Sequence, residues 1–149
     1  MAYPGLWLCG PPGVGKSTVG YEIFVAIHRT GRKAAYVDAD QVGMCYPAPN
    51  DDPHNHTLKA LNVAAVWRNF RAADAQCLIV SGAIRSEEDS LLYREQLADV
   101  SLLVCRLSVG GTSSEPGLRF AAWVTDRHYP VEQSGAPSNP NLYERRSAS

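Results

Sequence analysis

Residues 10–17 read Gly-Pro-Pro-Gly-Val-Gly-Lys-Ser, which is a complete G-x-x-x-x-G-K-S/T pattern. The pattern stands between a short apolar run at 6–9 and a helical pattern that begins at Lys16 and continues to about Ile27. A phosphate-binding loop needs a strand, a glycine-rich turn and a helix in this order. The glycines let backbone N–H groups converge on phosphate oxygens, and the helix adds the positive end of its dipole. The stretch therefore predicts a nucleotide site.

The residues of this loop have the chemistry that a nucleotide requires. Lys16 can bridge the β- and γ-phosphates, Ser17 offers a hydroxyl oxygen to Mg²⁺, and Thr18 follows near the α-phosphate. The alternative is an ordinary helix capped by a Gly-Pro turn, with Lys16 solvated, and the flanking patterns favour the phosphate loop. The predicted nucleotide contacts are Gly10, Pro11, Pro12, Gly13, Val14, Gly15, Lys16, Ser17 and Thr18.

The composition favours a single domain that binds small molecules. With 149 residues, 45% of them hydrophobic and 19% charged, the chain can form a real core. A formal net charge of -1 gives no reason to expect nucleic acid or a membrane as a partner, and oligomeric state stays open. The cysteines, at 9, 45, 77 and 105, show no C-x-x-C spacing, and no secretion signal or membrane span is visible. We therefore expect reduced thiols in a cytoplasmic protein.

Apolar runs alternate with helical patterns over the first part of the chain. This order is typical of a three-layer α/β/α fold with a mainly parallel sheet. We expect Thr57 to be a helix N-cap, followed by Leu58, Leu61 and Ala65 at helical spacing. The further predicted elements are strands at 34–38, 77–80 and 101–107 and helices at 57–73 and 86–97.

The pattern stops after residue 107. Of the 42 residues from 108 to 149, 15 are Ser, Gly or Pro, too many turn formers for a regular strand or long helix. We therefore divide the chain into a nucleotide-binding core, 1–107, and an irregular tail, 108–149, in which only residues 118–124 suit a short helix. Three interpretations of the tail stay open: a nucleotide lid, an irregular packing segment or a disordered segment. For a lid, Arg119 and Arg127 are the candidate arginines.

Two carboxylates follow the second predicted strand, at Asp38 and Asp40. Residues two apart project to the same side of a strand, so both can face the crevice in which open α/β sheets bind ligands. One carboxylate there can hold Mg²⁺ through water or accept the proton of an attacking hydroxyl. The alternative is that one caps the following turn and the other is solvated.

The third predicted strand excludes some nucleotide-binding classes. Residues 78–80 run into Ser81-Gly82, whereas motor, transporter and AAA-type ATPases place an acidic residue at this point. The chain also lacks an Asn-Lys-x-Asp string for guanine recognition. These absences favour ATP and argue against motors and switch GTPases.

Taken together, these features resemble adenylyl-sulfate kinases and, more broadly, the small-molecule kinase branch of P-loop NTPases, which includes nucleoside monophosphate kinases. The resemblance covers about residues 5–107 and also rests on the helix at 62–73, the run at 75–81 and Tyr-Arg-Glu at 93–95. It implies that Asp38 lies near Mg²⁺ and the acceptor hydroxyl, that Asp40 faces the acceptor and that Asn62 touches it. It also implies that Ser81 lies beside the phosphate loop, within reach of a Mg²⁺-bound water.

The chain departs from this family on the acceptor side. Gly43 stands where the family's Asp-Gly-Asp-Asn-x-Arg pattern has arginine, and Asn62 is followed by Val-Ala-Ala in place of an arginine pair. A bidentate guanidinium site for phosphosulfate cannot be built from these positions, so a less anionic acceptor is easier to accommodate. Arg85, just past the third strand, is a candidate for phosphate or acceptor binding, or else a solvated side chain.

A second cluster offers a possible metal site. His54 and His56 stand beside Asp51 and Asp52, but a polar loop leading to a helix cap also explains them.

The sequence therefore predicts an ATP-dependent kinase that uses MgATP to phosphorylate a small-molecule hydroxyl, with Lys16 and Asp38 as the catalytic residues. Ser17 and Asp38 would hold the metal, and Asp40, Asn62 and Arg85 the acceptor. The alternative is a nucleotide-binding module with weak or no hydrolysis that acts through a protein partner.

Overall fold

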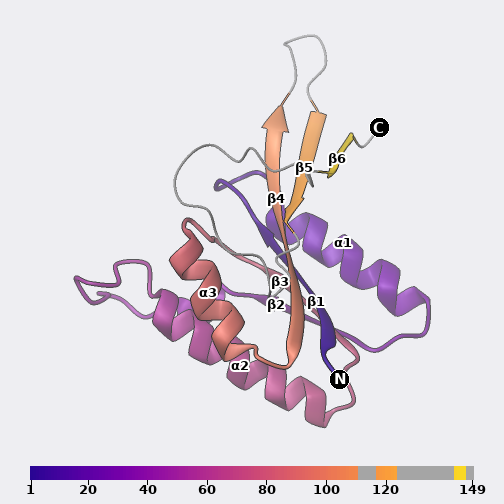
Figure 1. Cartoon of the computed structure of the whole chain (residues 1–149), viewed down its shortest axis with the longest axis horizontal. Coiled ribbons are helices and arrows are strands. Elements are labelled where there is room, and N and C mark those ends of the chain that lie inside the picture. The colour runs from indigo at the N-terminus through magenta and orange to yellow at the C-terminus, as the bar shows by residue number, and fades with distance from the viewer. Residues whose placement is uncertain (111–116, 124–142, 147–149) are drawn as a thin grey trace.

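A computed structural model describes residues 1–110, 117–123 and 143–146. In this part of the chain, strands and helices alternate up to β4, and two further strands follow (Figure 1). The elements are β1 (Tyr3–Cys9), α1 (Lys16–Arg29), β2 (Ala34–Asp38), a short 3-10 helix η1 (Gln41–Gly43), α2 (His56–Ala72), β3 (Cys77–Ser81), α3 (Glu87–Gln96), β4 (Val100–Gly110), β5 (Gly117–Trp123) and β6 (Tyr143–Arg146).

The described strands form one sheet in the order β2-β3-β1-β4-β5-β6. The first four strands are parallel, and β5 and β6 are antiparallel to their neighbours. Ser81 pairs with both Leu8 of β1 and Asp38 of β2. The register therefore brings the ends of β1, β2 and β3 to one edge, where open α/β sheets bind ligands.

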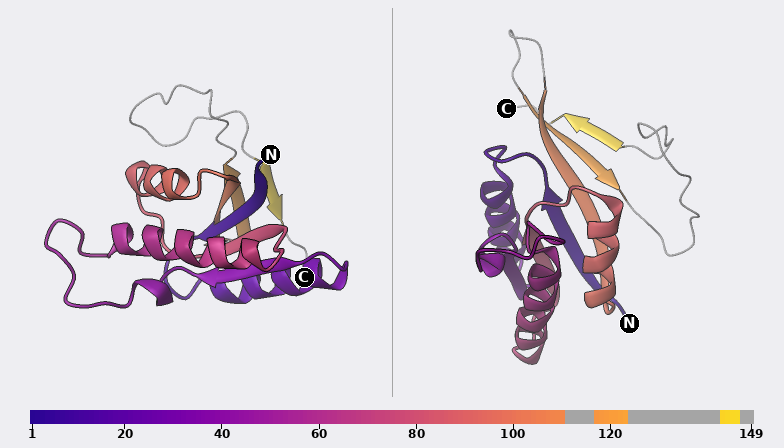
Figure 2. Two further views of the ribbon diagram at one scale, coloured as in Figure 1. Left: turned by 90° about the horizontal axis from the view of Figure 1, so that it is seen from below. Right: turned by 90° about the vertical axis from the view of Figure 1, so that its left-hand side faces the viewer.

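Helices cover both faces of the sheet. One core cluster joins the strands to α2 and α3 through Val63, Trp67 and Tyr93, and a second joins Leu8 to Val19 and Ile23 of α1. Both views of Figure 2 show β1 between α1 and α3. The predicted three-layer α/β/α fold with a mainly parallel sheet is thus confirmed.

Strand β3, which lies between β2 and β1, is fully covered and is tied to its neighbour. All its residues are buried, as expected for a parallel strand covered on both faces. The indole N–H of Trp7 on β1 donates to the carbonyl oxygen of Gly82 at 3.0 Å. This bond fastens the segment after β3 to the neighbouring strand.

The start and the buried face of α2 differ from the prediction. The N-cap is Asn55, not Thr57, and the Asp52 carboxylate accepts from the backbone N–H groups of both His56 and Thr57 at 2.9 Å. Leu61, expected on the apolar stripe, is 50% exposed. The core contacts of α2 are made instead by Ala60, Val63, Ala64 and Trp67, because the packing against the sheet and α3 sets the rotation of the helix.

The predicted irregular tail is wrong for the part of it that is described. The expected boundary at residue 107 falls inside β4, which continues to Gly110, and β5 and β6 add to the same sheet. The short helix expected at 118–124 is also wrong, because residues 117–123 pair with β4 as a strand. Residues 117–123 form a strand because pairing with β4 outweighs the local preference of the turn formers. Val124 and Arg127 lie outside the described residues, so the lid stays a prediction.

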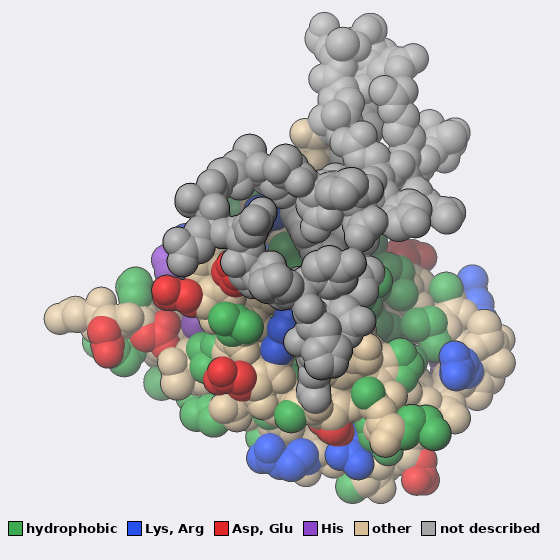
Figure 3. Space-filling view, viewed as in Figure 1, with side chains coloured by type: hydrophobic (Ala, Val, Ile, Leu, Met, Phe, Trp, Pro, Cys, Tyr) green, Lys and Arg blue, Asp and Glu red, His purple; other side chains and the backbone are tan. Residues whose placement is uncertain are grey.

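Neither the charges on the described surface nor the described helices show an extreme feature. On the face in Figure 3, both acidic and basic side chains are scattered over the described part, in keeping with the net charge of -1. Within the described ranges, no helix is long and apolar enough to cross a membrane.

Candidate functional site

The phosphate loop has the backbone geometry that its sequence predicts. It joins the end of β1 to the first residue of α1, and Gly13 and Gly15 have φ values of 77° and 99°. This left-handed region is open to glycine and strained for other residues. A Cβ atom on Gly10 would lie 2.5 Å from the carbonyl oxygen of Leu107, so a glycine there lets the loop pass close to β4.

Lys16 lies folded against this loop. Its ammonium group donates to the carbonyl oxygens of Gly10 at 2.9 Å and Pro11 at 3.1 Å. The charge is thus held where the loop begins, next to the backbone N–H groups of a helix N-terminus. A cation and a helix dipole at one place form an anion site.

Oxygen atoms gather beside the first turn of α1. The Ser17 hydroxyl donates to Asp38 Oδ2 at 3.2 Å, and Asp38 Oδ1 accepts from the backbone N–H groups of Asp40 at 3.1 Å and Gln41 at 3.4 Å. A carboxylate and a hydroxyl next to a phosphate site are the donor set that Mg²⁺ takes in nucleotide complexes. The residues present therefore fit a magnesium ion, and Ser17 and Asp38 are its candidate protein ligands.

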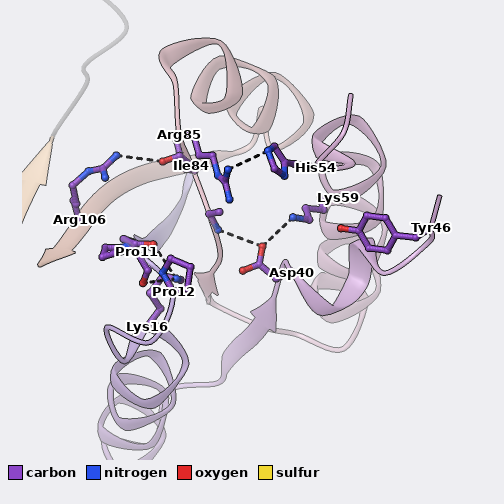
Figure 4. Close-up of a pocket in the computed structure, with 12 residues that line it drawn as sticks. Pro11, Pro12, Lys16, Asp40, Tyr46, His54, Lys59, Ile84, Arg85 and Arg106 are labelled. Carbon is purple, nitrogen blue, oxygen red and sulfur yellow. Dashed lines mark hydrogen bonds and ion pairs between the residues drawn. The ribbon is translucent and has the colours of Figure 1, made fainter. Parts of the chain in front are cut away.

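A cavity of about 820 Å³ opens from the loop, within the usual size range of small-molecule sites (Figure 4). The loop forms one wall, and the segments after β2, before and within α2, and after β3 form the rest together with β4. The lining residues are Gly10, Pro11, Pro12, Lys16, Asp40, Tyr46, His54, Lys59, Ala83, Ile84, Arg85 and Arg106.

An ion pair lies in the wall opposite the loop. The Lys59 ammonium group is 3.0 Å from Asp40 Oδ1, and the lysine side chain is only 7% exposed whereas that of Asp40 is 44% exposed. The lysine stem lies over Gly43, where a Cβ atom would approach its Cε to 2.7 Å. Asp40 therefore faces the cavity with a buried counter-charge behind it. Sequence reasoning missed Lys59, although its position one turn before Val63 on the helix was a signal for burial.

Arginines complete the cavity wall. The Arg85 guanidinium donates to His54 Nε2 at 3.1 Å. Arg106 of β4 donates to the carbonyl oxygen of Ile84 at 3.3 Å. Arg85, a predicted candidate for acceptor or phosphate binding, lies in the wall, whereas Arg106 and His54 were not predicted as cavity residues.

Seven predicted site residues are not part of the cavity lining, namely Asp38, Asn62 and, from the predicted nucleotide contacts, Gly13, Val14, Gly15, Ser17 and Thr18. Asp38 sits beside Ser17, as described above. Asn62 donates to the carbonyl oxygen of Val42 at 2.6 Å and so ties α2 to η1. Its predicted contact with an acceptor stays a prediction.

Of the two histidines in the predicted metal cluster, His56 forms a buried link between α2 and α3. His56 Nδ1 lies 2.8 Å from the Tyr93 hydroxyl, and its Nε2 lies 3.4 Å from Asp89 Oδ2. Burial lowers the pKa of His56 and raises that of Tyr93. Among the residues that the structure describes, no group of three or more His, Cys, Asp or Glu side chains could hold a metal ion. The loop interpretation is therefore favoured over the metal site.

Comparison with known proteins finds similar structures but no similar sequences. No family model and no curated protein sequence matches the chain. A mutant of the APS kinase CysC from Mycobacterium tuberculosis aligns with a TM-score of 0.51 and 20% identity, over 69% of this chain and 73% of that chain.

Two further structures agree. The same enzyme in complex with AMPPNP and APS aligns with a TM-score of 0.50 and 20% identity, over 69% of this chain and 61% of that chain. A hexameric APS kinase from Thiobacillus denitrificans gives a TM-score of 0.56 at 12% identity, over 77% of this chain and 24% of that chain. The chain thus spans less than two thirds of each of these two chains, whereas it covers 73% of the mutant chain. These likenesses agree with the α/β fold expected from the sequence, and at 12–20% identity they show the fold alone.

Proposed function

We propose that the protein transfers the γ-phosphoryl group of MgATP to a hydroxyl of a small molecule. The observation that carries the proposal is the cavity of about 820 Å³ that joins the phosphate loop to the Asp40–Lys59 pair. A nucleotide bound on the loop would leave the opposite wall for an acceptor. An acceptor hydroxyl between the two walls could then attack the γ-phosphate in line.

On the nucleotide side, the loop N–H groups and Lys16 would bind the β- and γ-phosphates. Ser17 and Asp38 would hold Mg²⁺, which supplies neutralisation of the phosphate charge. Lys16 leaves its contacts with the carbonyl oxygens of Gly10 and Pro11 to do so. Catalysis would then come mainly from positioning and charge stabilisation.

On the acceptor side, Asp40 has the position to orient a hydroxyl or take its proton. It lines the cavity, whereas Asp38 does not, and both oxygens of Asp38 already accept hydrogen bonds. We therefore keep for Asp38 only the role of metal ligand. The role of orienting or deprotonating the acceptor hydroxyl moves to Asp40. Because the phosphoryl-transfer transition state is loose, this carboxylate need not be a strong base.

The test is ADP release from MgATP in the presence of pooled hydroxyl compounds, with the wild type and Asp40→Asn compared. We expect at least one pool to stimulate ADP release by the wild type and much less by the variant, at unchanged affinity for ATP. Nucleotide binding without stimulation by any pool would favour the alternative, a binding module that acts through a protein partner.

A further inference from the structure

Tyr36 on β2 reaches across to the first helix. Tyr36 and Asp38 are two residues apart on the strand, so they project to the same side of the sheet. The ring passes beside α1 at Gly20, where a Cβ atom would lie 2.8 Å from Tyr36 Cε2. Gly20 is the one residue of α1 that is fully buried. The absence of a side chain at position 20 thus makes room for the tyrosine ring.

The hydroxyl at the end of this ring lies among the oxygens of the predicted metal site. It is 2.7 Å from Ser81 Oγ and donates to the carbonyl oxygen of Ser17 at 3.4 Å. Ser81 is 1% exposed and pairs across the sheet with Asp38, which in turn accepts from the Ser17 hydroxyl. The Tyr36 hydroxyl therefore connects Ser81, at the end of β3, to Ser17, in the first turn of α1. Both of these residues are neighbours of Asp38.

This arrangement does more than satisfy a buried hydroxyl. Ser81 could be satisfied by a single partner, but Tyr36 also contacts the backbone of Ser17, the residue whose side chain would bind the metal. Groups that hold metal ligands in place commonly change metal affinity 10- to 100-fold when removed, even though they do not touch the ion.

We propose that Tyr36 is a positioning residue for the divalent cation, which holds Ser17 and Ser81 in place and so sets the metal-dependent part of nucleotide affinity. This proposal rests on the proposed function only in so far as the loop binds a nucleotide with Mg²⁺. Gly20 has a part in it, because it admits the ring.

The test is calorimetric titration of a non-hydrolysable ATP analogue with Mg²⁺ and, separately, with EDTA. We expect Tyr36→Phe to lower the gain in affinity due to Mg²⁺ by about 10-fold and to leave the affinity in EDTA unchanged. Tyr21→Phe is the matched control, because Tyr21 lies on α1, is 56% exposed and should leave both affinities unchanged. An unchanged Mg²⁺ gain in Tyr36→Phe, or an equal loss with and without the metal, would overturn the proposal.

A second variant tests the role of the ring position. Gly20→Ala should reduce the Mg²⁺ gain, and adding it to Tyr36→Phe should give less than the product of the two single losses, because both act through the same hydroxyl. Losses that multiply would remove Gly20 from the proposal. If the wild type shows the Mg²⁺ gain but transfers no phosphoryl group to any acceptor, the proposed function fails and the inference about Tyr36 stands. A wild type whose affinity for the analogue does not respond to Mg²⁺ would overturn the inference itself.

Discussion

The two walls of the cavity are built in different ways. The phosphate-loop wall comes from one unbroken stretch of the sequence, residues 10–16, and its conformation follows from local glycines and the start of α1. The opposite wall collects Asp40, His54, Lys59 and Arg85 from separate segments that only the sheet order and the packing of α2 bring together. A local motif therefore identifies the proposed nucleotide side, whereas tertiary structure defines the proposed acceptor side.

The largest effect is expected from a change in the loop wall. Lys16→Ala should abolish phosphoryl transfer and weaken nucleotide binding by about 10²-fold or more, because a preorganised charge next to the phosphates is lost. Calorimetric titration of ATP measures this, with Lys33→Ala, an exposed lysine outside the cavity lining, as the control. Equal affinities for the two variants would mean that the loop does not bind the phosphates.

The next largest effect is expected at Asp38, which contacts Ser17 in the first turn of α1. Asp38→Asn should lower phosphoryl transfer by about 10²-fold, because a carboxylate that would hold Mg²⁺ is lost and the metal stabilises the phosphate charge, and should keep the affinity for ATP measured in EDTA. The reason is that Asp38 contacts Ser17 and not the loop backbone. Single-turnover transfer and titration in EDTA provide the two readouts. Transfer at the wild-type rate would exclude Asp38 from the mechanism.

A smaller effect is expected in the opposite wall. Asp40→Ala leaves the buried Lys59 ammonium group without its carboxylate and should lower the free energy of unfolding by about 1–3 kcal/mol. Lys59→Met fills the same space without a charge and should cost less. Urea unfolding compares the two variants. An equal loss for both would show that an unpaired ammonium group in this wall adds no cost beyond the lost ion pair, and would contradict the prediction.

The smallest effect concerns the pH dependence of protein stability, through His56 on α2, the helix that also carries Lys59. Burial holds the pKa of His56 below its ordinary value of 6.5, while Asp89 and Asp52 raise it and Lys59 and His54 lower it further. The unfolded chain therefore binds a proton at a higher pH than the folded chain. The stability contributed by neutral His56 is present above pH 6.5 and is lost as the pH falls below it.

The measurement is the urea midpoint at pH 7.5 and 5.5. We expect the decrease between these pH values to be smaller in His56→Asn than in the wild type. A decrease of the same size in both proteins would assign the pH dependence to other groups.

The contrast between the walls also explains what the sequence could predict. The fold, the loop and Arg85 were predictable, because the strand–loop–helix order and residues that directly follow a strand are local features. Lys59 was missed because an apolar stripe was sought through Leu61, while the packing of α2 turned Lys59 inward and Leu61 outward. Strands β5 and β6 were missed because pairing with β4 is non-local and the surrounding sequence is rich in turn formers.

The central claim is that phosphoryl groups cross the cavity from the loop to an acceptor. The most direct test is to incubate the protein with MgATP labelled in the γ-phosphate and with the acceptor pool that best stimulates ADP release, and to separate the products. The account predicts label in a phosphorylated organic product, formed by the wild type and much less by Asp40→Asn. Label that stays in ATP or appears only as inorganic phosphate would contradict it.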